Sequence, residues 1–377
     1  KTSILLSSIF SLFYLILNFL DISFFLVNNT EFHVSLIPFN LLSLENFLKS
    51  LLYTSFLTIG VILVSRNWRD AVSSNVFFKF SKKPFVIGVS GDSGSGKDTF
   101  SDSIINLFGS NSVLKLSGDD YHISDRQKPI WQVMTHLNPM TNNLELLYNN
   151  IIKITNGKSI LSRSYNHNTG KMSKPFKVSQ KDFIIVSGLH SLYLPILVSC
   201  YDLKIFLKMD EKLRRVLKIK RDVFERGHKL ENVIKSLKKR EKDSEKFIKP
   251  QQDKADLIFS ILPIHPSMVN IKNNKEDIKL KLVVTTRNWF NELSLHRVLV
   301  GICGLHVDIY SNKENSNIQI TIEGDASSAD FELASKILCP NVIEFLNIPT
   351  KWNDGVNGLM QLITLSHISQ NLTKRLI

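Results

Sequence analysis

The stretch that most constrains this chain is GDSGSGKD at 91–98. An apolar run, FVIGVS at 85–90, comes directly before it, and DTFSDSIINLF at 98–108 follows with apolar residues at helical spacing. The three glycines let backbone amides wrap around phosphate oxygens, and the lysine before the helix adds a positive charge. A chance glycine-rich turn would not explain the strand before the loop and the helix after it. The pattern therefore predicts a nucleotide phosphate site between a strand and a helix.

The rest of the chain alternates short apolar runs with helical stretches. Strands are expected at 113–117, 183–187, 203–209 and 257–262, with helices at 210–224 and 230–245 between them. This alternation predicts an α/β fold with a doubly wound, mostly parallel sheet over 84–268. Beyond a polar segment near 270–278, further strand and helix patterns predict a small α+β C-terminal subdomain over 279–377.

Two apolar segments near the N-terminus predict membrane helices. Residues 4–27 carry one charge, Asp21, and the shorter run at 50–65 is flanked by Lys49 and Arg66. At about 1.5 Å per residue the first run crosses a bilayer core of about 30 Å. A single helix with an interfacial segment is the alternative.

The basic flank of the second run gives an orientation. Arg66 and the basic linker 67–83 place the following domains in the cytoplasm by the positive-inside rule. We therefore expect residues 1–66 to be a membrane-anchoring region with a hairpin of two helices, in an inner or plasma membrane.

Charge narrows the choice of ligand. The net charge is +13, and residues 204–254 hold 18 Lys or Arg against 9 Asp or Glu. This balance favours a phosphate-rich ligand or an anionic membrane surface. Nucleic acid is not expected, because the basic segment lacks interleaved aromatic residues for base stacking. The three cysteines form no C-x-x-C pair, which predicts neither a metal site nor a disulfide framework.

Six further stretches follow the loop in a characteristic order. They are SGDDYHISDR (117–126), HLNPMTNNLELLY (136–148), YNHNTG (165–170), SGLHSLY (187–193), KIKRDVFERGH (218–228) and FIKPQQDKADLIFSILP (247–263). Together they resemble the phosphoribulokinase and uridine kinase family, most of all phosphoribulokinases of the plant and cyanobacterial type. The resemblance implies a P-loop kinase domain over 84–268 that uses ATP and Mg²⁺ to phosphorylate a hydroxyl of a sugar phosphate.

The resemblance also implies roles for individual residues. Asp119 follows a predicted strand, where open parallel sheets bind ligands, and would orient or deprotonate the acceptor. Lys97 and Asp222 would complete the catalytic set. The ATP-binding residues would be Gly91, Asp92, Ser93, Gly94, Ser95, Gly96, Lys97, Asp98 and Thr99. The acceptor would be bound by His122, Arg126, His167, Lys218, Arg221 and Arg226.

For some nearby residues the role stays open, and others are not assigned to the site. Lys218, Arg221 and Asp222 have i, i+3, i+4 spacing and would share one helix face. His190 could be structural or functional. We interpret Lys238, Lys239 and Arg240 as part of a solvated basic helix.

Two departures from the family pattern concern the metal. Asp98 stands where the loop usually has Ser or Thr, and Ser187 stands where the E-G-L-H motif has its acidic residue. We interpret the two as a compensating exchange, with both as Mg²⁺ ligands, because hard oxygen ligands suit magnesium from either place. The loop has serines where photosynthetic relatives carry a redox cysteine, so thiol control is not expected.

Two alternatives to a sugar-phosphate kinase remain. One is a uridine or nucleoside kinase, which the retained basic set disfavours. The other is a membrane-tethered nucleotide-binding regulator with little catalysis. A homo-oligomer is also left open.

Overall fold

The computed structural model describes residues 52–55, 58, 83–167, 169–269, 278–287, 292–312, 317–340, 342, 346 and 349–376. The chain divides into two compact units, 1–75 and 76–377. The predicted membrane helices 4–27 and 50–65 and the linker 67–83 lie outside the described residues, apart from 52–55, 58 and Lys83. In the described part of the chain, no helix has the length and apolar character needed to cross a membrane.

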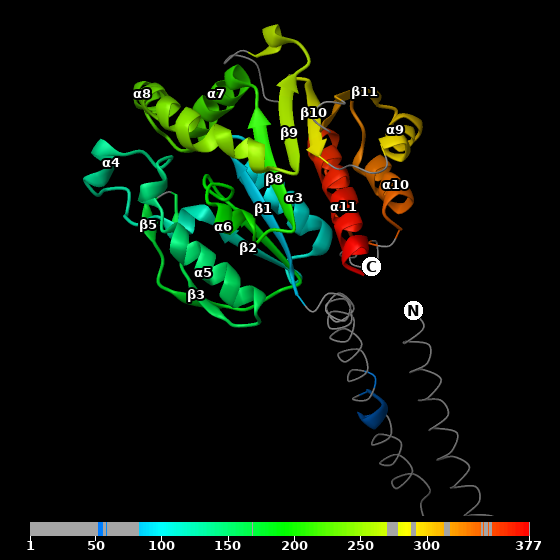
Figure 1. Ribbon diagram of the computed structural model, residues 1–377, viewed down its shortest axis with the longest axis horizontal. Helices are drawn as coiled ribbons and strands as arrows, with labels where there is room; N and C mark the ends of the chain where they lie inside the picture. The colour runs from blue at the N-terminus through cyan, green and yellow to red at the C-terminus, as the bar shows by residue number, and fades with distance from the viewer. Residues whose placement is uncertain are drawn as a thin grey trace, which may run out of the picture. The chain divides into compact units, whose positions relative to one another are not determined.

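The second unit is built on an eight-stranded sheet in the order β11-β12-β10-β9-β8-β1-β7-β2. One side of this sheet is parallel, and its strands match the five predicted runs: β2 (Val113–Ser117), β7 (Phe183–Ser187), β1 (Phe85–Gly91), β8 (Leu203–Met209) and β9 (Leu257–Pro263). β1 is buried along its whole length because helices cover both faces, as expected for an apolar run in a parallel sheet. The predicted doubly wound, mostly parallel α/β fold is confirmed (Figure 1).

Helices lie on both faces of the parallel strands. α3 (Lys97–Phe108) packs Phe100 and Ile104 into one apolar core, and α5 (Leu144–Thr155) packs Leu147 and Ile151 into the other. α4 (Ile130–Val133) and α6 (Pro195–Val198) are short. Two small hairpins, β3 (Ile160–Ser162) with β6 (Phe176–Val178) and β4 (Tyr165–Asn166) with β5 (Lys171–Met172), lie outside the main sheet.

The predicted helix at 210–224 differs in its last turns. α7 (Glu211–Lys220) is regular, but Arg221–Glu225 forms a π-helical turn before α8 (Leu230–Asp243). A π turn adds a residue to the turn and rotates the side chains that follow it. Lys218, which precedes this turn, contacts the loop at 91–97, whereas Arg221 and Asp222 bond to one another.

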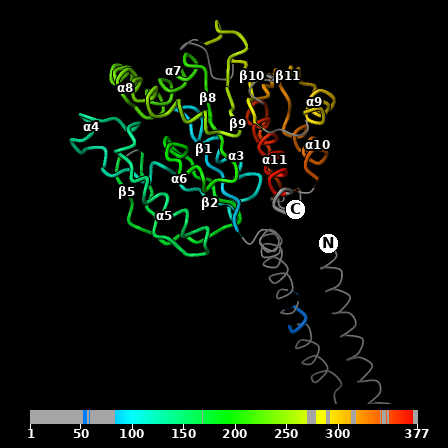
Figure 2. The backbone as a smooth tube through the Cα atoms, viewed as in Figure 1, coloured from blue at the N-terminus to red at the C-terminus, as the bar shows by residue number. Residues whose placement is uncertain are grey.

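The C-terminal segment continues the same sheet. β10 (Leu280–Arg287) pairs antiparallel with β9, and β12 (Asn317–Glu323) and β11 (His306–Asn312) follow. α9 (Glu292–Gly301), α10 (Ser328–Leu338) and α11 (Gly355–Leu376) cover these strands (Figures 1 and 2). The region thus has the predicted α+β content, and it shares its apolar core with the parallel strands.

One buried side chain ties α11 to the helix that follows the phosphate loop. Gln361 is 0% exposed, and its Nε2 donates to the carbonyl oxygen of Ser103 in α3 at 2.7 Å. Its Oε1 accepts from the backbone N–H of Asn353 at 2.8 Å. The amide is thus bonded on both sides, which fixes α11 against α3.

Candidate active site

The phosphate loop lies between β1 and α3, as the sequence predicts. Gly94 and Gly96 have φ angles of 86° and 89°, a region that strongly favours glycine. The Nζ atom of Lys97 donates to the carbonyl oxygens of Gly91 at 3.0 Å and Asp92 at 2.8 Å. Burial lowers the pKa of Lys97, although Asp98 and other carboxylates oppose this effect. The loop is thus held in shape around a lysine that has no ion pair with a carboxylate among the described residues.

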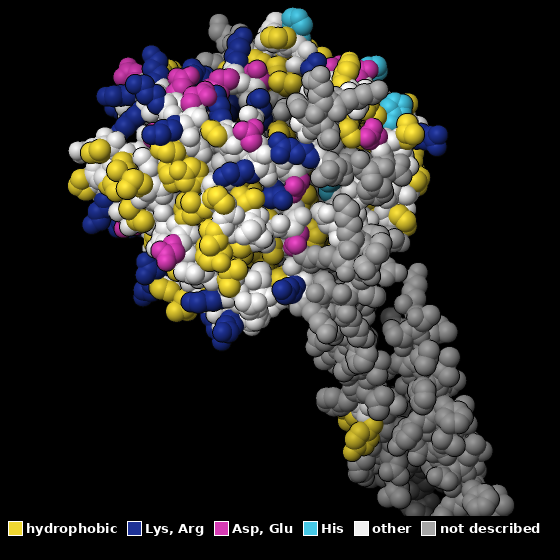
Figure 3. Space-filling view, in the orientation of Figure 1, with side chains coloured by type: hydrophobic (Ala, Val, Ile, Leu, Met, Phe, Trp, Pro, Cys, Tyr) yellow, Lys and Arg dark blue, Asp and Glu magenta, His cyan; other side chains and the backbone are white. Residues whose placement is uncertain are grey.

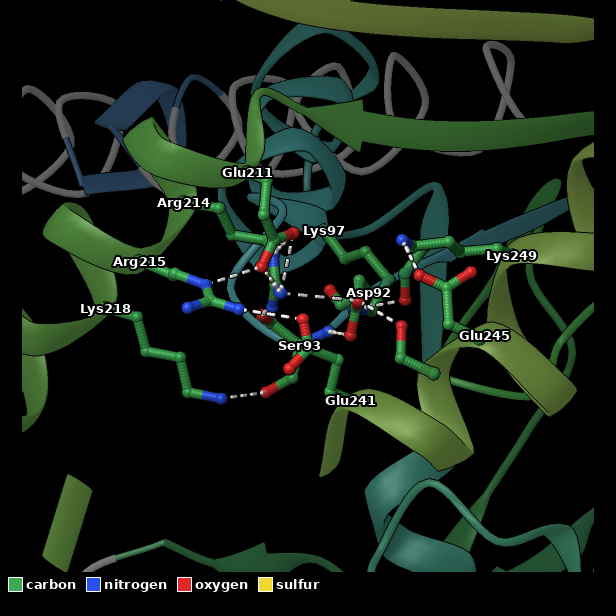
Figure 4. Close-up of polar contacts among 12 residues, drawn as sticks. Asp92, Ser93, Lys97, Glu211, Arg214, Arg215, Lys218, Glu241, Glu245 and Lys249 are labelled. Carbon is green, nitrogen blue, oxygen red and sulfur yellow. Dashed lines mark hydrogen bonds and ion pairs between the residues drawn. The ribbon is translucent and has the colours of Figure 1, made fainter. Parts of the chain in front are cut away.

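Side chains from α7 and from the turn after α8 brace the loop (Figure 4). Asp92 accepts from the backbone N–H of Ser93 at 2.7 Å and from the hydroxyl of Ser244. Arg214 donates to the carbonyl oxygen of Ser93 at 2.8 Å, and Glu211 binds the same guanidinium through both carboxylate oxygens. The charge of Arg214 is therefore already compensated, and its role at the loop is structural.

Lys218 makes a different contact with the loop. Its Nζ donates to Oγ of Ser93 at 3.0 Å, and the residue is 4% exposed. Burial lowers the pKa of Lys218 to about 7, and the positive charge of Arg240 adds to this effect. Lys218 has no ion pair with a carboxylate in the described part of the chain.

A cavity of about 360 Å³ opens beside the loop. Its wall includes residues from the ends of β2 and β7, from the 118–141 and 165–167 segments, and from α7 and α8. All of the predicted acceptor-binding, catalytic and metal-binding residues line it: Lys97, Asp98, Asp119, His122, Arg126, His167, Ser187, Lys218, Arg221, Asp222 and Arg226. From the predicted ATP-binding loop, Ser93 and Gly94 also face the cavity. The structure thus brings together residues that are more than 100 positions apart.

Asp119 follows the end of β2 and lines this cavity. Its carboxylate lies between two imidazoles, with Oδ2 3.3 Å from Nε2 of His167 and Oδ1 3.7 Å from Nε2 of His122. The neighbouring Asp120 instead accepts from the backbone N–H of Tyr165 at 2.7 Å. Burial raises the pKa of Asp120 to about 6. The two adjacent carboxylates therefore have different roles: Asp120 binds the backbone of Tyr165, and Asp119 lines the cavity.

The cations of the cavity fall into two groups. Arg221 and Arg226 share the carboxylate of Asp222, at 2.9 Å and 3.4 Å. Asp222, predicted as catalytic, therefore positions two arginines. Arg126 and Arg240 have no ion pair in the described part of the chain, and Arg126 lies over the Tyr165 ring.

The interpretation of Arg240 as part of a solvated basic helix is wrong. Arg240 lines the cavity from α8, together with Asn232, Val233 and Ser236. Asn232, Ser236 and Arg240 are spaced by four residues and so share one helix face. This polar stripe ending in an arginine is the signal that could have identified it. Figure 3 shows that many Lys and Arg side chains gather around the α7–α8 end. Charge alone therefore does not distinguish Arg240 from its basic neighbours.

Aromatic residues at the acceptor end were also missed. The rings of Trp131 and His136 stack with centroids 3.7 Å apart. Burial lowers the pKa of His136 to about 2, so this ring is neutral at pH 7. Nδ1 of His136 and the hydroxyl of Tyr165 have no hydrogen-bond partner among the described residues. Both residues line the cavity, although these two atoms are themselves buried.

The two predicted metal ligands face the same cavity from different elements. Asp98 is on the first turn of α3 with its side chain 77% exposed, 3.3 Å from Nζ of Lys115. Burial would raise the pKa of Asp98, but Lys115 and Lys97 lower it, so the carboxylate is ionised. Ser187 ends β7 and is 4% exposed. Across the described ranges no three His, Cys, Asp or Glu side chains cluster as a complete metal site. One carboxylate and a hydroxyl fit Mg²⁺ of the kind that takes its other ligands from phosphates and water.

The fold and the cavity define an α/β protein of the P-loop nucleotide-binding class. The sequence profile described as the phosphoribulokinase / uridine kinase family matches residues 86–266. Phosphoribulokinase of Synechocystis sp. is 38% identical over 178 residues, which are 47% of this chain and 54% of that protein. Uridine kinase of Ligilactobacillus salivarius is 34% identical over 180 residues, which are 47% of this chain and 84% of that protein. The chain belongs to the phosphoribulokinase / uridine kinase family.

These likenesses have limits in length and identity. The chain spans about half the length of the Synechocystis and Chlamydomonas reinhardtii phosphoribulokinases that it matches. The solved phosphoribulokinase of Rhodobacter spheroides superimposes with a TM-score of 0.54 over 79% of this chain and 100% of that chain, at 18% identity. This structural likeness supports the fold.

Proposed function

We propose that this protein is an ATP-dependent kinase that transfers the γ-phosphate to a hydroxyl of a sugar phosphate. The observation that carries the proposal is a cavity lined both by the phosphate loop and by Asp119. Phosphoryl transfer needs a site that cradles the donor phosphates, cations around the transferred group and a carboxylate at the attacking hydroxyl. All three are present in one space of a size that suits small ligands.

Each group has a role in this reaction. The loop amides and Lys97 hold the β- and γ-phosphates. Lys218 and Arg240 bring positive charge to the cavity and neutralise the charge that develops on the transferred phosphoryl group. Asp119 accepts the proton of the attacking hydroxyl, and His167 orients its carboxylate. Asp98 and Ser187 would hold Mg²⁺, which would supply positive charge at the donor phosphates.

The cations favour a phosphorylated acceptor over a nucleoside. Arg126 has no carboxylate partner in the part of the chain that the structure describes, and Arg221 and Arg226 share one, so this group keeps positive charge for a second phosphate. Guanidinium groups bind phosphate in a bidentate manner. Ribulose 5-phosphate is our first candidate, and uridine is the alternative because a uridine kinase is among the relatives.

ADP release tests the proposal. The full-length protein with ATP and Mg²⁺ would be offered ribulose 5-phosphate, other pentose phosphates and uridine, with Asp119→Asn as the inactive control. We expect turnover with a sugar phosphate and its loss in the variant. Preference for uridine would establish the nucleoside kinase. ATP binding without turnover on any acceptor would establish the nucleotide-binding regulator.

We also propose that residues 1–66 anchor the protein to a membrane with the kinase domain in the cytoplasm. The apolar run at 4–27 with one charge, and the basic flank after 65, support this. Carbonate extraction of membranes from expressing cells tests it, since an embedded helix resists extraction. Recovery of the full-length protein in the extracted fraction would contradict the anchor.

A further inference from the structure

The backbone sets Asn142 directly opposite His122 at the acceptor end. The two residues form an isolated antiparallel bridge. On either side of it, the N–H of Ile123 donates to the carbonyl of Thr141 at 3.1 Å, and that of Asn143 to the carbonyl of Tyr121 at 2.8 Å. The amide oxygen of Asn142 consequently lies 2.7 Å from Nδ1 of His122.

The orientation of the Asn142 amide follows from its other neighbours. Nδ2 lies 3.1 Å from Oγ1 of Thr141, 3.3 Å from the carbonyl oxygen of Asn138 and 3.5 Å from that of His136. Carbonyl oxygens only accept hydrogen bonds, so the amide atom that faces them must be the nitrogen. The oxygen therefore faces His122, and Nδ1 of His122 must carry a proton.

His190 extends the same series of hydrogen bonds. Its Nε2 lies 2.8 Å from the carbonyl oxygen of Leu137 and must donate to it. His190 is 4% exposed, and burial lowers its pKa to about 4, so the ring is neutral. Its Nδ1 is then an acceptor and lies 3.4 Å from Nδ2 of Asn142. The histidine thus favours the same amide orientation as the backbone carbonyls do.

The other side of His122 is therefore an acceptor. The side chain is 4% exposed, and burial lowers its pKa. A neutral ring with a proton on Nδ1 has a bare lone pair on Nε2. This atom lies 3.7 Å from Oδ1 of Asp119, which is also an acceptor. Nε2 of His122 and Oδ1 of Asp119 cannot hydrogen-bond to each other, because both accept. Each therefore needs a donor from a third group in the cavity.

We infer that Asn142 and His190 are positioning residues that hold His122 as a hydrogen-bond acceptor for a second hydroxyl of the substrate. Asp119 receives the hydroxyl that is phosphorylated, and His122 receives another close to it. His122 in this form cannot bind a phosphate oxygen, since both atoms accept. The substrate class is a polyol with a free hydroxyl near the reacting one. The assignment of the His122 tautomer does not depend on the proposed function. Only the identification of the donor as a substrate hydroxyl rests on that function.

Nitrogen-15 NMR of the histidine rings tests the tautomer without any acceptor. The full-length protein, labelled at histidine, is measured near pH 7, and His122 is assigned by its loss in His122→Gln. We expect a protonated Nδ1 and a bare Nε2. A proton on Nε2, or on both nitrogens, would overturn the inference whatever the protein phosphorylates.

Variants test the positioning role. In Asn142→Ala the acceptor for Nδ1 is gone, so we expect the His122 proton to move to Nε2, beside Asp119. Asn138→Ala is the matched control, because among the described residues the side chain of this asparagine accepts only from the backbone N–H of Met140. It should leave the tautomer unchanged. An unchanged tautomer in Asn142→Ala would overturn the role of Asn142, and a changed one in the control would show that general loosening of the loop is enough.

Deoxygenated substrate analogues test which hydroxyl donates a hydrogen bond to His122. The probes are ribulose 5-phosphate with its 3-deoxy analogue, and uridine with its 2′-deoxy and 3′-deoxy analogues. With the accepted parent compound, removal of the hydroxyl that meets His122 should lower kcat/KM by about 10- to 100-fold, because a buried acceptor is left unpaired. In His122→Ala this discrimination should fall to about twofold. Equal discrimination in the wild type and the variant would contradict the assignment of the hydroxyl.

Discussion

The Nζ atom of Lys218 lies 3.0 Å from Oγ of Ser93, so a helix late in the fold reaches a loop 125 positions earlier in the chain. The contact places a buried amine where the donor phosphates are expected. Because burial lowers the pKa of Lys218 to about 7, its charged and neutral forms are both populated at neutral pH. The surrounding cations contribute to this lowering of the pKa. A bound anion would offset their repulsion and so favour the protonated form of the amine.

The pH dependence of turnover should report Lys218. The protonated amine is the form that neutralises phosphate, so kcat/KM for ATP should fall as pH rises through about 7. Lys218→Arg keeps its charge at every accessible pH, and its profile should lose this basic limb. The same limb in the variant would assign the titration to another group. A pH–rate profile between pH 5.5 and about 9 makes the comparison.

The buried amine should also cost stability. The pKa of Lys218 in the folded state is below the unfolded value of 10.5, so the unfolded chain binds the proton more tightly. The cost is greatest below pH 7 and disappears as pH rises towards 10.5. We expect Lys218→Met to raise the free energy of unfolding at pH 7 by about 1–3 kcal/mol while removing activity. Denaturant titration measures the change, and a less stable variant would contradict the prediction.

Arg240 should matter more than its basic neighbours. Its guanidinium lines the cavity, whereas Lys238 is exposed on the same helix. Arg240→Met should lower kcat by about 100-fold or more, because a preorganised positive charge at the transferred group is lost. Lys238→Met is the matched control and should stay within about twofold of the wild type. Similar losses in both variants would mean that the basic helix acts through its overall field.

Asp98 and Asp102 form a second matched pair. Both carboxylates bind Nζ of Lys115, but only Asp98 lines the cavity. Asp98→Ala should lower Mg²⁺-dependent turnover by more than about 100-fold, since a metal ligand is lost. Asp102→Ala should keep most activity.

The exchange between Asp98 and Ser187 has its own test. Asp98→Ser combined with Ser187→Glu should restore activity that Asp98→Ser alone lacks, because the carboxylate returns to the sheet. Isothermal titration of Mg²⁺ with ATP present gives a readout apart from activity. Near-normal turnover in Asp98→Ala would refute the exchange.

Much of the parallel half was predictable because its signals are local. Each strand of this half is a short apolar run, and the phosphate loop has glycines at the turns that need them. The gathering of Asp119, Lys218 and His167 was predictable only through the family resemblance. Carboxyl ends of parallel strands meet at one sheet edge, but side-chain contacts between them depend on packing that no periodicity encodes.

Three features were not predicted, each for a physical reason. The π turn at Arg221–Glu225 has no distinct composition, and it contains Asp222, which pairs with two arginines. Arg240 is hidden among other charges, since charge alone does not tell a cavity-facing side chain from a solvated one. The strands β10–β12 were expected as a small subdomain, and edge-to-edge pairing with β9 is a non-local contact that leaves no mark in either segment.

The hydrogen bond from Gln361 to Ser103 has a consequence for how the protein is made. Its partners are 258 positions apart, and it fixes the helix that carries the phosphate loop. The ribosome must therefore translate α11 before this contact with α3 can form. Such late closure lengthens exposure of the apolar strands, so we expect demand for chaperones in the cell to be high for this chain.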